Sequence, residues 1–551
     1  MKLVNGISLL GLFFICSHTN ANDLNYQVSL EAEAISQSVK DSEGNQTVES
    51  DNLIVTPSFS LTYNSKRLQG FWRANQNHVR RSIGSSSVTQ NYVNYNYGGE
   101  VVIIENLLNF VASGALSQQS PNLNGFQTDD ILLNADNLSK TRRNAASLGL
   151  NIPRGDYFGL SSTLTYSNSK SERNATGFEG LENNRTLLTS NIVTGNDFKR
   201  LYAAVNTQVS LQKRFEGNGD VLSRQAEAAL SFSVIGNLGF TLSATNEGNQ
   251  VSSEDNIFSV ARNFSTYGAG LSWRKSEDSF FTITANTSDG EQLGQSDTDN
   301  QNFIGFNTRW QFTPRTSISA RYGRRVFGES GEFSFSHQIK RFRTQVSYTE
   351  EITSFSNLTS DPTSLGVFVC ADGARDLSAC FQPSSLNYQL GPNEEFVQFS
   401  DQNTEISDEL ILRQALSWQM GISKRRTNLS FNGRYSLNEY LESDRLNRTY
   451  SAGIALGFGI GQKTNLTWNT QYAVSNNQFE GTSSESISLS SDVSISRNLG
   501  QYLNINLQAR YLDLKSEGEN SGGTVIGFTG VSGDLKDRRI TISLSYRYGS
   551  K

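Results

Sequence analysis

The chain has 551 residues, of which 36% are hydrophobic, 10% aromatic and 18% charged, and its formal net charge is −6. A soluble protein of this length would need more Leu, Ile and Val for its cores, so the composition argues against a set of soluble domains. The acidic balance, without any block of basic residues, gives no support for a nucleic-acid partner.

The first 21 residues predict a secretory signal peptide. Lys2 supplies the charged start, residues 7–16 form an apolar segment, and Thr19-Asn20-Ala21 is a cleavage site with small residues at both key positions. The mature chain, residues 22–551, is therefore expected to leave the cytoplasm.

A lipoprotein signal at Cys16 is the alternative, but the bulky Phe14 and Ile15 precede it, where such signals have small residues. Beyond this segment no apolar run reaches about 18 residues, so no transmembrane helix is predicted. If the mature chain crosses a membrane, it is expected to do so as strands.

Period-two alternation recurs along the mature chain and predicts β-strands. Residues 51–64, 450–460 and 503–511 are clear examples, in which apolar side chains alternate with small or polar ones. Short polar turns at 64–66, 153–155, 236–237, 313–315, 461–463 and 498–500 are interspersed with long polar stretches at 37–50, 119–141, 249–261, 289–302, 353–408 and 515–537. A weaker strand at 186–193 completes the rhythm. The chain is predicted to be all-β.

This alternation of short and long connections predicts a transmembrane antiparallel up-and-down β-barrel in the bacterial outer membrane. The number of strands is about 24 (22–26), with short periplasmic turns and long extracellular loops. Expected strand lengths of about 10–14 residues suffice to cross a membrane at the usual tilt. A β-sandwich is the alternative, but a sandwich does not sort its short and long connections to opposite ends.

The end of the chain and the aromatic residues favour the barrel. Residues 540–548 alternate regularly and end in an aromatic, as barrel precursors do for recognition by the assembly machinery, although three residues follow Tyr548. Outward-facing aromatics are expected to gather near the short turns as a periplasmic girdle: Trp273, Phe281, Trp310, Phe312, Trp468, Tyr546 and Tyr548.

The longest connection, 353–408, is expected on the cell exterior. It contains Cys370 and Cys380, which in an exported chain predict one disulfide closing a short loop. A metal site would need more ligands, and no histidine lies nearby in the sequence.

The strand phase opposite the apolar one should line the lumen. It is rich in Ser, Asn, Gln, Thr and Gly, with fewer acids, among them Glu227, Glu351, Glu409 and Asp492. The candidate lumen-lining arginines are Arg309, Arg321, Arg341, Arg343, Arg413, Arg434, Arg510 and Arg547. Amides and hydroxyls suit hydroxyl-rich solutes, and guanidinium groups attract carboxylates or phosphates. The alternative is that any wide barrel needs a polar wall with some charge.

Catalytic motifs are not recognisable. A barrel hydrolase would need a Ser–His pair with an orienting acid or amide, but His78 and His337 have only the Ser and Asn neighbours that chance provides in such a chain. No cofactor, metal or enzymatic activity is therefore expected.

Several segments resemble the PEP-CTERM system-associated outer-membrane protein family. They are residues 51–63 (DNLIVTPSFSLTY), 67–77 (RLQGFWRANQN), 108–122 (LNFVASGALSQQSPN) and 320–353, which contains YGRRVFG. The resemblance covers most of the mature chain. It implies a barrel that acts beside exopolysaccharide biosynthesis and the exosortase sorting system, and it carries over no catalytic or ligand residue.

The sequence and the resemblance together predict a passive conduit or assembly factor for exopolysaccharide export. The expected partners are outer-membrane lipid, the barrel assembly machinery, the polysaccharide and periplasmic export components. Two alternatives stay open: a general or sugar-selective porin, in which 353–408 narrows the pore, and a surface-exposed structural or adhesive barrel.

Overall fold

The fold was analysed in a computed structural model. It describes residues 23–41, 47–83, 86–119, 131–132, 138–173, 180–214, 219–252, 262–276, 278–290, 301–354, 367–371, 380–381, 394–398, 409–443, 445–479, 481–518 and 535–549. The predicted signal peptide lies outside these residues and stays a prediction. Among the described residues, no helix is long and apolar enough to cross a membrane.

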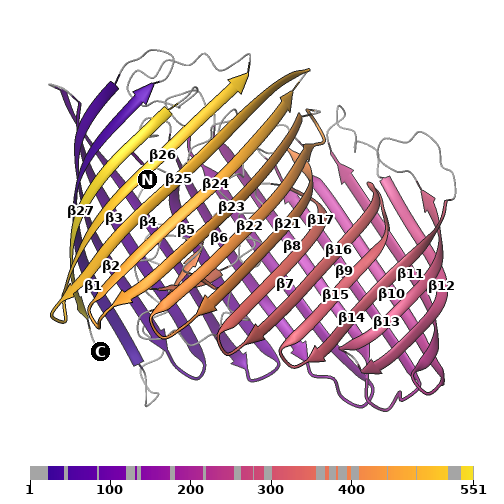
Figure 1. The fold of residues 1–551 in the computed structure, drawn as a ribbon. Coiled ribbons are helices and arrows are strands. Elements are labelled where there is room, and N and C mark those ends of the chain that lie inside the picture. The colour runs from indigo at the N-terminus through magenta and orange to yellow at the C-terminus, as the bar shows by residue number, and fades with distance from the viewer. Residues whose placement is uncertain are drawn as a thin grey trace, which may run out of the picture.

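The architecture is a ring of 24 antiparallel strands, which confirms the predicted fold class (Figure 1). The ring strands are β1 (Asp23–Asp41), β2 (Thr47–Asn64), β3 (Leu68–Ile83), β4 (Ser86–Ile104), β5 (Leu108–Gln119), β6 (Ser139–Ile152), β7 (Phe158–Ser171), β8 (Leu181–Thr194), β9 (Leu201–Lys213), β10 (Val221–Ile235), β11 (Leu238–Val251), β12 (Arg262–Ser276), β13 (Ser279–Gly290), β14 (Asn302–Thr313), β15 (Thr316–Arg325), β16 (Gly328–Ile339), β17 (Phe342–Ser354), β21 (Leu410–Ser423), β22 (Thr427–Tyr440), β23 (Arg445–Ile460), β24 (Thr464–Phe479), β25 (Thr482–Leu499), β26 (Leu503–Gly518) and β27 (Leu535–Gly549). The strand expected at 186–193 is β8.

The first and last strands close the ring. β1 pairs with β27 from Gln27 opposite Gly549 to Asp41 opposite Leu535. Closure pairs the first and last strands with each other, so neither leaves an open edge with unsatisfied backbone donors and acceptors, as a membrane-spanning structure requires. The amphipathic C-terminal strand predicted from the sequence is therefore the closing element.

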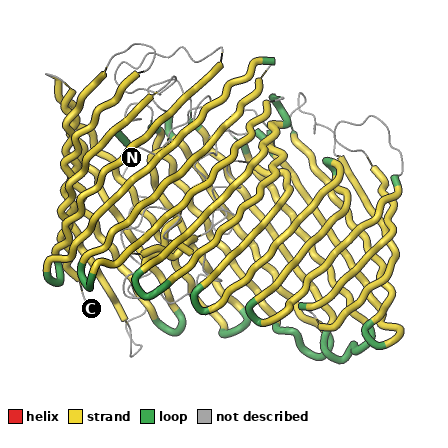
Figure 2. Tube along the Cα trace, in the orientation of Figure 1, coloured by secondary structure: helices red, strands yellow, loops and turns green. Residues whose placement is uncertain are grey.

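Every connection longer than six residues lies at one end of the ring, which also carries a few short ones, and the other end has short turns throughout. Figure 2 shows tight turns, such as 236–237 and 314–315, along the lower edge. The register places the start of β1 and the end of β27 at that same end. This is the asymmetry of bacterial outer-membrane barrels, and the short-turn end is periplasmic.

The outer surface is apolar and the inner surface polar, as the last strand illustrates. Ile540, Ile542 and Leu544 are 59%, 56% and 46% exposed, whereas Ser543 between them is 3% exposed. Of the predicted girdle, Trp273, Phe281, Phe312, Trp468, Tyr546 and Tyr548 are exposed, and Trp310 stacks on Trp273 with ring centroids 4.9 Å apart. The chain is a bacterial outer-membrane β-barrel with a lipid-facing apolar belt.

One part of the inner face departs from the expected polar lining. Ile35, Ile54 and Val79 point inward near the long-connection end of β1 to β3 and form a buried cluster with Tyr92. Leu132, from the connection between β5 and β6, completes the cluster and is 2% exposed. The inner wall is apolar here because a connection packs against it, which strand phase alone does not reveal.

The 355–408 connection contains a second, three-stranded sheet made of β18 (Val367–Ala371), β19 (Cys380–Phe381) and β20 (Glu394–Gln398). β18 and β19 place Cys370 directly opposite Cys380 in antiparallel register. The side chains of both cysteines lie outside the described part of the structure, so the disulfide stays a prediction, as does the exterior position of this connection.

Candidate functional site in the lumen

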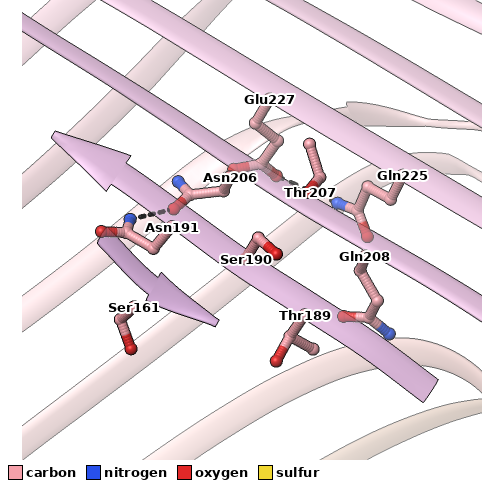
Figure 3. A pocket seen from close by; sticks show the side chains of 9 residues that line it. All are labelled: Ser161, Thr189, Ser190, Asn191, Asn206, Thr207, Gln208, Gln225 and Glu227. Atoms are coloured by element: carbon pink, nitrogen blue, oxygen red, sulfur yellow. Dashed lines mark hydrogen bonds between the residues drawn. The ribbon is translucent and has the colours of Figure 1, made fainter. Parts of the chain in front are cut away.

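A polar pocket of about 270 Å³ lies on the inner wall formed by β7 to β10 (Figure 3). Register places one row of its side chains across neighbouring strands: Ser161 opposite Asn191, Asn191 opposite Asn206, and Asn206 opposite Glu227. Thr189, Gln208 and Gln225 form the next row, while Ser190 and Thr207 complete the lining. The residues of the two rows share the inner face because period-two alternation turns every second side chain inward, whereas Ser190 and Thr207 lie between the rows in the opposite phase.

The pocket offers donors and acceptors in nearly equal measure. Asn191 donates a hydrogen bond to Asn206, and Gln225 Nε2 donates to Glu227 Oε1 over 3.0 Å. An amide has two donor hydrogens and one acceptor oxygen, so each side chain keeps capacity for a further partner. Solute hydroxyls also both donate and accept, and this lining therefore matches a hydroxyl-rich ligand.

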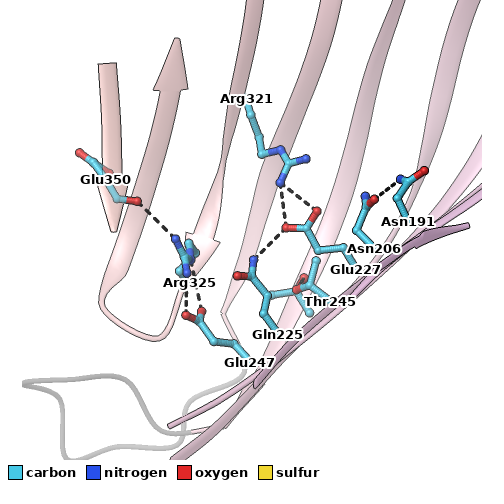
Figure 4. Close-up of polar contacts among 10 residues, drawn as sticks. Asn191, Asn206, Gln225, Glu227, Thr245, Glu247, Arg321, Arg325 and Glu350 are labelled. Carbon is cyan, nitrogen blue, oxygen red and sulfur yellow. Dashed lines mark hydrogen bonds and ion pairs between the residues drawn. The ribbon is translucent and has the colours of Figure 1, made fainter. Parts of the chain in front are cut away.

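Glu227, at the edge of the pocket, contacts a residue on a different wall of the lumen. Arg321 Nη1 on β15 lies 2.8 Å from Oε1 and 2.9 Å from Oε2 of Glu227 on β10 (Figure 4). β10 and β15 are not neighbours, since β11 to β14 separate them along the ring. The Arg321 side chain is 42% exposed, so its guanidinium group remains accessible beside the pocket.

A second ion pair lies closer to the long-connection end. Arg325 Nη2 is 2.8 Å from Glu247 Oε1 on β11, and the Val326 backbone N–H donates to the same carboxylate over 3.3 Å. Arg325 also donates to the backbone carbonyl of Glu350 on β17. Val326 has no exposed surface.

The tip of the β15–β16 hairpin makes this contact because it leaves the ring. Pairing with β14 stops at Tyr322, and pairing with β17 begins only at Phe333. Residues 323–332 are therefore a two-stranded ribbon, paired within itself but with neither neighbouring strand. An unpaired ribbon can bend away from the wall, and its tip is buried against β11 and β17.

Apolar packing joins the same two walls. Val221 on β10 and Val251 on β11 form a buried cluster with Leu410 on β21, to which Ile352 and Leu441 add. Ser354 donates to Gln212 over 3.1 Å, and Arg214 pairs with Glu442 at 2.6 Å.

These contacts have a topological consequence. Because the strands are joined across a closed ring, the lumen at this level is split into a smaller compartment beside β12 to β16 and a larger one. We use the name clasp for all contacts that join β9 to β11 on one wall to β15 to β17, β21 and β22 on the other.

The predicted lumen arginines occupy three regions. Arg309, Arg321, Arg343, Arg413 and Arg434 lie on β14 to β22, and their inward direction follows from the outward-facing Trp310, Tyr322 and Trp418 in the alternate phase. Arg510 and Arg547 lie on β26 and β27, with Arg510 opposite Asp492. Arg341 lies in the turn between β16 and β17, outside any strand.

Among the predicted acids, Glu227 lies in the pocket and Glu351 opposite Arg413. Glu409 accepts a hydrogen bond from Ser443 just before β21 begins. The sequence did not single out Arg325, Glu247 or Glu350. A sequence signal for Arg325 was nevertheless present, because it directly follows Arg324 at the end of a strand. In a strand of the wall, alternation would turn one of two adjacent arginines toward lipid, so the pair indicates that the strand leaves the wall here.

The histidines take part in separate, local contacts. His78 Nδ1 lies 2.6 Å from Asn91 Oδ1, and His337 Nδ1 lies 2.8 Å from the Thr316 hydroxyl. Within the described ranges, no group of three or more His, Cys, Asp and Glu side chains is arranged to hold a metal ion. The expectation that the chain is not an enzyme stays a prediction.

No protein-family model matches this chain, and neither does any curated protein. Among solved structures, the chain is similar to the FrpB iron transporter from Neisseria meningitidis (F3-3 variant), at 10% identity, covering 96% of this chain and 82% of that one, with a TM-score of 0.40. It is also similar to the siderophore receptor PirA from Pseudomonas aeruginosa, at 8% identity, 96% and 81% coverage and a TM-score of 0.38. OccAB3 from Acinetobacter baumannii matches at 10% identity, with 95% and 99% coverage and a TM-score of 0.29.

Proposed function

We propose that this barrel is a passive outer-membrane conduit for a hydroxyl-rich polymer, an exopolysaccharide moving from the periplasm to the cell surface. The observation that carries the proposal is the lumen pocket in which Ser161, Asn191, Asn206 and Gln225 meet Glu227. The resemblance to the PEP-CTERM-associated family supplies the direction and the kind of polymer.

The walls suit a polymer that slides past many weak sites. Each amide or hydroxyl contact to a sugar is worth about 0.5–1.5 kcal/mol net, so a chain is held by several contacts at once but is not trapped by any one of them. Transport through a pore requires such binding, which is favourable enough for entry and weak enough for release.

The test is deletion of the gene in its natural host. We expect surface and secreted polysaccharide to fall, and the wild-type gene supplied in trans to restore it. Complementation with the Asn191→Ala, Asn206→Ala double variant should restore it only in part, provided that equal amounts of barrel reach the outer membrane. Normal polysaccharide in the deletion strain would overturn the export role.

A porin for small solutes is the second candidate, and the clasp is the observation that favours it. Contacts such as Arg325–Glu247 divide the lumen and so reduce the width that any one solute meets. In this case deletion would slow uptake of small sugars and leave surface polysaccharide unchanged. Measuring both quantities in one deletion strain separates the two functions.

A further inference from the structure

The periplasmic rim carries a one-sided set of basic residues. Four successive short turns around the ring, β14–β15, β16–β17, β21–β22 and β23–β24, hold Arg315, then Lys340 and Arg341, then Lys424 to Arg426, then Lys463. These turns contain seven basic residues and no acidic one. We call this part of the rim the basic arc.

The other short turns differ. By sequence, the seven remaining turns contain five basic and five acidic residues, so their charges cancel. Some of these basic residues are also engaged within the protein. Lys66 pairs with Glu105 at 3.4 Å, and Arg154 donates to the backbone carbonyls of Thr194 and Gly195. A chain with a net charge of −6 thus concentrates uncompensated positive charge on one part of its rim.

The side chains of the basic arc face solvent. All seven residues are exposed, and none takes part in an ion pair between described residues. Consecutive turns with the same sign of charge repel one another, which weakly destabilises the rim. Their potentials add over a distance of about 8 Å at physiological ionic strength. Together they attract an anion that one exposed charge would not retain.

The basic surface continues from the rim onto the lumen wall. Arg343 is the second residue of β17, directly above the turn that holds Lys340 and Arg341. Arg309 on β14 lies four residues before the end of its strand, above Arg315. Both point inward in the phase opposite Trp310 and Trp418. Arg321, beside the amide pocket, extends the path further.

We propose that the basic arc, with Arg343 and Arg309 above it, is the periplasmic entrance for an anionic glycan whose repeating unit carries a carboxylate, such as a polyuronate. The proposal rests on the conduit function and adds the charge of the polymer and its point of entry. A glycan is favoured over an acidic docking protein because the positive charge continues into the lumen, where a folded partner would not reach. Electrostatic steering of this kind raises association rates by 10-fold to 1,000-fold.

The experiment uses the full mature barrel in planar bilayers and, separately, in detergent micelles. The arc variant replaces Lys340, Arg341, Arg425 and Arg426 by Gln, so that it loses as many charges as the control. The matched control replaces Lys66, Arg67, Lys199 and Arg200, in the other turns, by Gln. The probes are alginate oligomers, which are polyuronates, and neutral dextran of the same length, added to either chamber. Cleavage of the long connections by protease identifies the extracellular chamber for each barrel.

We expect alginate added on the periplasmic side to block current in the wild type and in the control. In the arc variant its blocking rate should fall by about tenfold or more, with open-pore conductance little changed. Raising the salt concentration should remove most of the difference. Equal block of the arc variant and the wild type, or an equal loss in the control, would overturn the proposal. The proposal would also fail if block by neutral dextran fell in the arc variant as much as block by alginate. It would fail as well if the only effect of the arc variant were a change in the stability of the barrel in anionic phospholipid.

Binding of fluorescent alginate in micelles keeps this inference separate from the conduit function. One outcome is that alginate binding depends on the basic arc but deletion of the gene leaves surface polysaccharide unchanged. That result would support the anion site and refute the export function. The opposite outcome is that deletion reduces surface polysaccharide but the arc variant binds alginate as well as the wild type does. That result would support export and refute the basic arc as the entrance.

Discussion

Two facing walls of the lumen differ in chemistry. The wall from β7 to β11 presents Asn191, Asn206 and Gln225 with the carboxylates of Glu227 and Glu247. The wall from β14 to β22 presents inward arginines instead, among them Arg309, Arg321 and Arg343, and continues into the basic arc. Where the walls meet, arginine pairs with glutamate, as Arg321 does with Glu227.

The difference shows how strands of the wall can themselves close part of the lumen through contacts between opposite charges. Like-charged walls would repel each other, whereas opposite charges with satisfied hydrogen bonds attract. The same arrangement leaves a solute between an amide-rich surface that carries two carboxylates and a surface rich in arginine. Substitutions on the two walls are therefore expected to differ in the property that they change and in the size of the change.

The largest effect is expected from Arg325→Ala. The change leaves Glu247, which is 7% exposed, without its charged partner, and breaking such a pair from one side costs about 3 kcal/mol. Urea unfolding in micelles measures the loss. The double variant Arg325→Ala, Glu247→Ala should lose less than the sum of the single changes. Strict additivity would mean that the two walls do not interact here.

Leu410→Ala should come next. Leu410 is 5% exposed in the apolar part of the clasp, and its truncation should cost about 2–3 kcal/mol while leaving the charged pairs in place. Leu416→Ala on the same strand, 38% exposed on the outer face, is the matched control and should cost less. Equal losses for the two leucines would argue against cross-lumen packing.

Asn206→Ala tests the amide wall. Loss of one hydrogen-bonding side chain should weaken block by a neutral oligosaccharide by about fivefold, equivalent to about 1 kcal/mol, with little change in stability. Titration of the single-channel current with dextran oligomers gives the affinity. Asn498→Ala, at the periplasmic end of β25 and outside the pocket, is the control, and a similar effect there would contradict a localised site.

Glu227→Gln should have the smallest effect on stability, below about 1 kcal/mol, because the Arg321 side chain is 42% exposed and solvent screens the pair. The current should nevertheless become more anion-selective, since one negative charge leaves the lumen beside an accessible guanidinium group. The reversal potential in a salt gradient measures this selectivity. A shift toward cations would contradict the inward position of both residues.

Much of the fold could be predicted because local rules determine it. Alternation predicted the strands, including the weak one that became β8, and short turns predicted the periplasmic end. The alternating strand at 540–548 became β27, which closes the ring. These features depend on neighbours within a hairpin or on one amphipathic strand, so the sequence contains them directly.

The clasp could not be predicted in the same way. Arg321 and Glu227 are 94 residues apart, and their contact depends on how the whole ring bends in cross-section. The inward Ile54 and Val79 also broke the phase rule, because their partner Leu132 comes from a connection rather than a strand. Arg341 was expected on a lumen-facing strand but occupies a turn, since β16 ends two residues earlier.

The central claim is a lipid-facing outer surface around an aqueous lumen, and a pair of adjacent cysteine variants tests it most directly. In a background with Cys370 and Cys380 replaced by Ser, Asn206→Cys faces the lumen and Val205→Cys the membrane on the same strand. A small membrane-impermeant maleimide applied to outer membranes should label the variant at position 206 and leave the variant at 205 unlabelled. Labelling at 205 with protection at 206 would contradict the account.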